Sequence, residues 1–168
     1  MIGIRIQDGP RALRAAVLAM RRADSGVRKI ISSDMRSVMG PVWKESVNQH
    51  LTGSGRLEAR LLTPGVRIAA GNPPQLIAAS STRRVGRGDL TPTANWQIYE
   101  FGSHGTKPSQ VTNRKGTTYS RRTRTGLPAY RKAGRVLYPA AGHVLPRIAA
   151  YWVQAIVRAF LDAAEGKK

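Results

Sequence analysis

The segment 103–135 limits the possible folds of this chain more than any other feature. It holds nine lysines or arginines, no aspartate or glutamate, and few apolar residues. Such a stretch cannot supply a core, because folding needs enough buried apolar surface to offset the entropy that the chain loses. The core must come from the residues on either side. We expect 103–135 to be a long basic arm or loop that is functional or becomes ordered on a partner.

The first 50 residues predict a strand followed by helices. Isoleucines at every second position of 2–6 indicate a short, half-buried strand. Apolar residues at helical spacing then predict two or three helices, with a break at Asp24 and an end or a kink at Pro41.

In the middle of the chain the spacing of the apolar residues is no longer helical. Short apolar runs predict strands at 56–62, 65–71 and 75–81, and the turn-forming residues between the last two favour antiparallel pairing. The compact aromatic segment 96–102 is compatible with a strand or with a short helix.

The C-terminal part regains regular structure. The segment 134–142 predicts a strand that ends at Pro139, and Pro146 then opens an amphipathic helix. Together these patterns predict one α+β domain over 1–168. Its N-terminal helices and C-terminal helix would pack on a small, mainly antiparallel sheet, and the basic loop would lie within it.

The charge balance points to an anionic partner. The chain carries 28 lysines and arginines against nine acids, for a net charge of +19. The positive electrostatic field of such a chain attracts anionic partners, which could be nucleic acid, an anionic membrane or an acidic protein subunit. A membrane span is not expected, because Pro139, His143, Pro146, Arg147 and Arg158 interrupt the most apolar stretch. The chain has no cysteine, which fits a reducing compartment.

Patterns typical of enzymes are weak. The three histidines, His50, His104 and His143, are far apart in sequence and share no metal-ligand spacing. The sequence contains no nucleophile elbow and no phosphate-binding loop. We therefore expect a protein that is not an enzyme, with no cofactor and no metal site.

Glu100 is the acid with two competing interpretations. Its aromatic neighbours Trp96, Tyr99 and Phe101 could form the apolar surroundings of a general base. Alternatively, the carboxylate caps backbone amides or pairs with one of the many arginines. The surrounding positive charge favours the structural role.

The basic arm also has two interpretations. Its cations and nearby tyrosines could contact phosphates and stack on bases, or the arm could bind an acidic protein. In either case the candidate contacts are Lys107, Arg114, Lys115, Arg121, Arg122, Arg124, Arg131 and Lys132.

Three motifs, in order, resemble a known family. "TGSGRL" at 52–57 is similar to a turn that leads into strands, "IYEFGS" at 98–103 to a central aromatic-EFGT motif, and "LYPAAGHVLPRIAAYW" at 137–152 to a terminal element with a final helix. This order resembles the minor tail or neck proteins of long-tailed bacteriophages, the group that includes the minor tail protein Z of phage lambda. Ser103 replaces the usual threonine, and the loop after the motif is unusually basic.

The resemblance implies a structural virion protein at the head–tail joint, made in the host cytoplasm. It would be a neck or tail-completion subunit, or a tail terminator. It would form a homo-oligomeric ring, with a hexamer as the expected state, that joins the head-closure proteins to the tail tube and leaves a channel for DNA. Gly102 would let the arm leave the domain. The central motif would contribute to subunit contacts through Tyr99, Glu100, Phe101 and Gly102.

An acidic protein is then the favoured partner of the arm, and DNA in the channel comes second. The alternative function is a nucleic-acid-binding protein that uses 103–135.

Overall fold

The computed structural model describes residues 2–5, 11–86, 89–104, 109–121 and 127–165. The α+β class predicted from the sequence is confirmed. The helices are α1 (Arg11–Arg22), α2 (Ser25–Asp34), the π-helical turn η1 (Met35–Met39), α3 (Gly40–His50), α4 (Arg56–Leu62), α5 (Pro92–Phe101) and α6 (Leu137–Ala164). The strands are β1 (Ile2–Arg5), β2 (Arg67–Ala69), β3 (Gln75–Ala78), β4 (Ser109–Thr112) and β5 (Thr118–Arg121).

The larger sheet has three antiparallel strands in the order β1-β3-β2. Ile4 of β1 and Ile68 of β2 both lie opposite Leu76 of the central strand. The predicted N-terminal strand and the predicted antiparallel pairing of 65–71 with 75–81 are therefore confirmed.

The N-terminal helices follow the predicted breaks. Asp24 is the N-cap of α2, and its carboxylate accepts a hydrogen bond of 2.8 Å from the Gly26 backbone N–H. Pro41 lies in the first turn of α3, directly after the π-helical turn η1, and its missing backbone N–H interrupts the helical hydrogen bonds at this point. Helix α2, the turn η1 and α3 follow one another without a gap, so the helical pattern continues past Pro41.

Two predicted strands are wrong, because both segments are helical. The segment 56–62 forms α4, and its start is stabilised by Glu58, whose carboxylate accepts a hydrogen bond from the Gly55 backbone N–H. The segment 134–142 runs into α6, which begins at Leu137 rather than at Pro146. Pro139 therefore lies in the first turn of the helix and does not end a strand.

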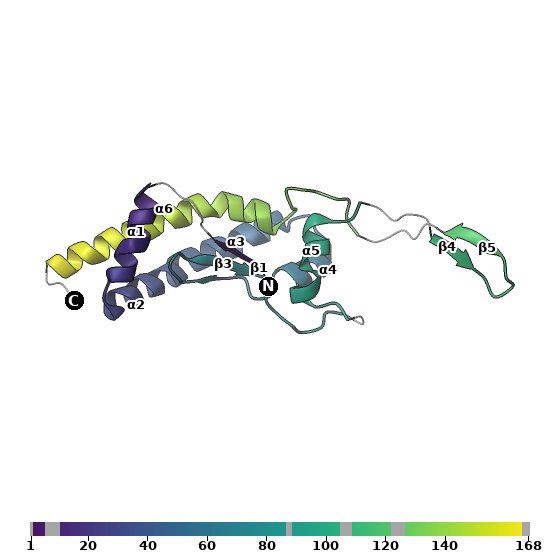
Figure 1. Ribbon diagram of the computed structural model, residues 1–168, viewed down its shortest axis with the longest axis horizontal. Coiled ribbons are helices and arrows are strands. Elements are labelled where there is room, and N and C mark those ends of the chain that lie inside the picture. Colours follow the sequence, from purple (N-terminus) through teal and green to yellow (C-terminus); the bar gives the residue numbers. More distant parts are fainter. Residues whose placement is uncertain (1, 6–10, 87–88, 105–108, 122–126, 166–168) are drawn as a thin grey trace.

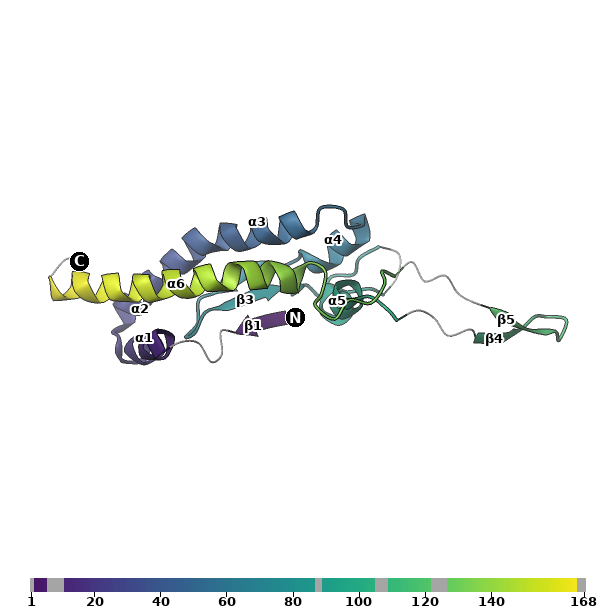
Figure 2. The ribbon, with the colours of Figure 1, turned by 90° about the horizontal axis from the view of Figure 1, so that it is seen from above.

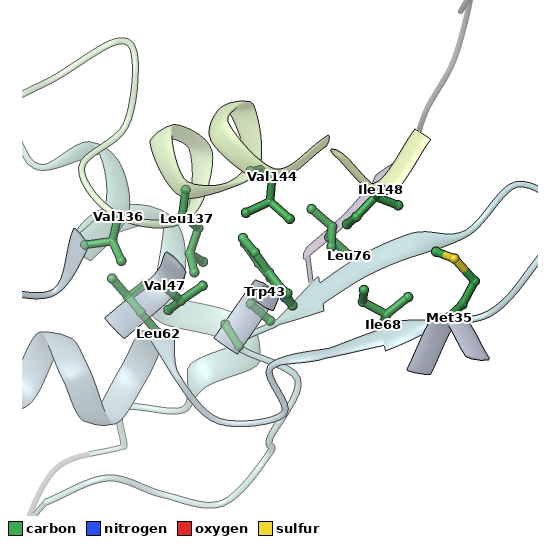
Figure 3. Close-up of a cluster of buried hydrophobic side chains, with 14 of the residues drawn as sticks. Met35, Trp43, Val47, Leu62, Ile68, Leu76, Val136, Leu137, Val144 and Ile148 are labelled. Carbon is green, nitrogen blue, oxygen red and sulfur yellow. The ribbon is translucent and has the colours of Figure 1, made fainter. Parts of the chain in front are cut away.

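The helices pack on the three-stranded sheet through one apolar core (Figure 3). Trp43 of α3 lies at its centre between α6 and the sheet, and its indole nitrogen donates a 3.1 Å hydrogen bond to the Ile77 carbonyl. Val144 and Ile148 approach from α6, and Leu76 from β3. Since α3 and α6 run side by side over the sheet (Figures 1 and 2), this core holds both helices to it.

Helix α6 is the one helix, among the residues the structure describes, that is long and apolar enough to cross a membrane by length and composition. In this fold one of its faces lies in the protein core. That face is formed by Leu137, Ala140, Ala141, Val144, Ile148, Trp152 and Ile156.

The basic arm is not a loop throughout, which corrects the sequence prediction. Strands β4 and β5 pair antiparallel within it, with Val111 opposite Tyr119. Figures 1 and 2 show this hairpin at one end of an elongated molecule, beyond α4 and α5, whereas α1, α2 and the C-terminal end of α6 lie at the other end. The strands contain valine, threonine and tyrosine, which are enriched in strands, but polar and basic residues surround them and the sequence shows no regular apolar alternation.

Candidate functional site

Glu100 is fully buried at the start of α6. Its two carboxylate oxygens accept hydrogen bonds from four consecutive backbone N–H groups, which belong to Arg135, Val136, Leu137 and Tyr138. The shortest, from Leu137 and Tyr138, are both 2.9 Å long. The first amides of a helix have no partner within it and carry partial positive charge. One side chain from α5 therefore satisfies the N-terminus of α6.

Helix α5 holds Glu100 in this position. The helix begins after Thr91, whose backbone N–H donates to the Asn95 side chain at 2.8 Å. Trp96 and Tyr99 are buried on the same helix. The Phe101 ring packs against Tyr138 of α6, with ring centroids 5.2 Å apart. Aromatic packing and the carboxylate thus join α5 to α6 at one point.

Gly102 ends α5 at a close backbone contact. Its φ of +76° lies in the region that favours glycine, and a Cβ there would collide with the carbonyl oxygens of Pro128 and Ala129. The segments on either side of the arm meet here: Ser103 N–H donates to the Pro128 carbonyl, and Arg131 N–H to the Phe101 carbonyl. The two ends of the arm are therefore fixed together where it leaves the helices.

Gly134 is a site residue that the sequence analysis missed. Its φ is +77°, and a Cβ at this position would overlap Oε1 of Glu100. The absence of a side chain lets the carboxylate reach the amides of α6. The only sequence signal was a glycine at the end of a polar stretch, which indicates a turn but not its neighbour.

The expected pairing of Glu100 with an arginine is not the contact observed for this carboxylate. Arg135 donates its backbone N–H to Glu100, while its guanidinium Nη2 donates to the Ala129 carbonyl at 2.7 Å. The other structural interpretation, capping of backbone amides, describes the site. Since both oxygens are engaged and the side chain is buried, this geometry gives no support to Glu100 as a general base.

The remaining members of the central motif take different positions. Tyr99 is buried, Phe101 is half-buried, and neither faces open solvent as a ready subunit contact. Together with Glu100 and Gly102 they form an internal joint. Their expected contribution to subunit contacts stays a prediction.

The predicted cations fall into three groups. Arg114 and Lys115 are exposed at the tip of the hairpin, and Arg121 is the last residue of β5. Arg131 and Lys132 are exposed where the chain returns to α6, near the fixed ends of the arm. Lys107, Arg122 and Arg124 lie outside the described residues.

Asn113 shapes the hairpin tip. Its side-chain oxygen accepts hydrogen bonds from the backbone N–H groups of Lys115 and Thr117, each 2.9 Å long. Gly116 completes the turn with a φ of +79°. This turn, another feature missed at the sequence level, presents Arg114 and Lys115 side by side at the far end of the ribbon.

An apolar groove runs between α1 and the C-terminal half of α6. It has a volume of about 490 Å³ and is lined by Ala15, Ala16, Ala19, Val153, Ile156, Val157, Phe160 and Leu161. Val157 and Leu161 are 53% and 58% exposed. Exposed apolar patches of this kind mark sites of association in soluble proteins.

No group of three His, Asp or Glu side chains that could hold a metal ion occurs within the described ranges. No protein-family model, curated protein or solved structure matches the chain.

Proposed function

We propose that this chain is a non-enzymatic structural protein of the head–tail joint of a long-tailed bacteriophage. In this role it is a neck or tail-completion subunit that forms a homo-oligomeric ring, with six copies as the expected number. The ring joins the head-closure proteins to the tail tube or tail terminator and leaves a channel for DNA. The proposal rests on the resemblance of the three ordered motifs.

One observation carries the proposal further: the three motifs adjoin in space. The turn at 52–57 leads into α4, and α4 packs on α5, which contains most of the central motif. Glu100 of that motif then caps α6, where the terminal motif begins. Motifs that are separated along the chain thus build a single joint, as expected if they are parts of one inherited scaffold.

The surface also supports a subunit that assembles. The groove between α1 and α6 leaves Val157 and Leu161 exposed, and the hairpin extends from the opposite end of the molecule (Figure 1). An interface between two different patches of the same chain closes into a ring when the rotation between neighbours divides a full turn. An elongated subunit with different surfaces at its two ends suits such an arrangement.

Electron microscopy of particles made without this protein tests the proposal. We expect filled heads and separate tails, because the joint that connects them is missing. Normal full-length virions would overturn the proposal. The mass of the purified assembly is a second readout: six copies of the 18.3 kDa chain correspond to roughly 110 kDa.

A further inference from the structure

The β4–β5 hairpin is a two-stranded ribbon with polar side chains on both faces. Its strands pair with each other, and the larger sheet contains neither of them. From Gln110 to Ser120 every residue except the half-buried Val111 is exposed. A two-stranded hairpin alone is marginally stable in water. A partner that covers this ribbon would therefore also stabilise it.

The composition of the ribbon is unlike the centre of a protein interface. Such centres are apolar and aromatic, but here Val111 and Tyr119 form the one apolar pair. The register places Gln110, Thr112, Thr118 and Ser120 on the other face. The segment 109–121 contains three cations, six hydroxyl groups and two amides, and no acid. These are the side chains that donate hydrogen bonds to the phosphates and sugars of DNA.

The geometry favours a double helix over a single strand. Proteins that bind single strands stack successive bases on several aromatic side chains, and Tyr119 is the one aromatic residue of the ribbon. A two-stranded β-ribbon fits the width of the major groove of a duplex. The turn held by Asn113 places Arg114 and Lys115 at the tip, where they would reach the phosphates first.

We propose that the β4–β5 hairpin binds duplex DNA through its phosphate backbone, with Arg114 and Lys115 as the leading contacts. The few cations on one ribbon give weak, sequence-independent binding that weakens further as the salt concentration rises. Weak binding by each subunit would let DNA pass, which strong binding would hinder. This inference concerns the subunit itself and does not depend on its place in a virion.

Binding of the purified chain to a duplex of roughly 30 base pairs, followed by fluorescence anisotropy between roughly 50 and 200 mM salt, tests the inference. The variant Arg114→Gln/Lys115→Gln removes the two tip charges. The control Arg28→Gln/Lys29→Gln removes the same pair of residue types from exposed positions on α2, at the other end of the molecule. Both variants have the same net charge.

We expect micromolar binding by the unchanged protein at the low end of that salt range. The affinity of the hairpin variant should be lower by about tenfold or more. The magnitude of its salt slope should fall by about 2, since each phosphate contact contributes about 0.9. The control should keep the slope of the unchanged protein. Equal losses in the two variants would overturn the inference, because they would indicate net charge and no defined site. Tighter binding to a single strand, or to polyglutamate at equal charge, would also overturn it, the latter in favour of an acidic protein partner.

A second measurement avoids substitutions altogether. In the unchanged protein, bound duplex should protect Lys115 from acetylation and leave Lys29 reactive, as read by mass spectrometry. Equal reactivity of Lys115 with and without duplex would contradict contact at the tip. Neither readout depends on whether the protein forms a ring, so failure here is distinct from failure of the proposed function.

Discussion

Gly134 lies directly against the carboxylate of Glu100, and this close contact is possible because glycine has no side chain. A Cβ on Gly134 would overlap Oε1 of Glu100, while the same oxygen accepts hydrogen bonds from the amides of Arg135 and Tyr138. The position of α6 relative to α5 thus depends on one acid and one glycine, which lie 34 residues apart.

Glu100→Gln should lower the free energy of unfolding by about 2–4 kcal/mol, because a buried, hydrogen-bonded charge is replaced by a group that is partly a donor. The amide nitrogen of glutamine would face backbone N–H groups that also donate. Urea denaturation measures the loss. Glu45→Gln, at an exposed position of α3, is the matched control and should change stability little. A Glu100→Gln variant as stable as the control would contradict the capping role.

Gly134→Ala should lower the free energy of unfolding by roughly 1–3 kcal/mol, since alanine is strained at positive φ and its Cβ displaces the Glu100 carboxylate. Gly142→Ala is the control, for which the expected change in the free energy of unfolding has the opposite sign. Gly142 lies inside α6 with open space at its Cβ position. There the same substitution should raise stability by about 0.5–1 kcal/mol, because alanine is the better helix former. Thermal unfolding of both variants compares the two effects, and destabilisation of similar size in both would contradict the special role of Gly134.

The sequence predicts local structure well where the pattern and the contacts are local. The N-terminal strand, the antiparallel pair around Leu76 and the helix break at Asp24 each depend on neighbouring residues or on a short turn, and each is confirmed. The start of α6 is different. Its amides are capped by Glu100 from another helix, so the local pattern around Pro139 showed only an interruption.

The candidate site was predictable in its residues but not in its arrangement. The aromatic–acid cluster identified Glu100, and the contrast between acid and surrounding arginines suggested a structural role. That the partners would be four backbone amides could not be read from the sequence, because any backbone segment offers the same donors. The hairpin was hidden for a related reason: its strands bury no apolar face, so they lack the alternation on which strand prediction relies.

Asp24 gives the start of α2 a dependence on pH. Hydrogen bonds from the backbone N–H groups of Gly26 and Ser25 lower the pKa of its carboxyl below the usual value. A lowered pKa in the folded state means that the charged form stabilises α2 above the ordinary pKa of aspartate. This contribution is lost as the pH falls through the folded-state value. In thermal unfolding between neutral and acidic pH, Asp24→Asn should keep the cap and remove this part of the pH dependence. An unchanged profile would contradict the assignment.

The exposed apolar edge of α6 should be needed for association and not for folding. Val157→Ser/Leu161→Ser changes two side chains that are more than half exposed, so the stability of the monomer should change by less than about 1 kcal/mol. If the groove between α1 and α6 is covered by another copy, the same change removes apolar surface from the centre of an interface. The assembled mass should then fall toward that of one chain. Sedimentation velocity measures the mass, and circular dichroism checks that the helices remain.

The control Gln154→Ser, at an exposed polar position of the same helix, should assemble normally. Normal assembly of the double variant would place the subunit contact on another surface.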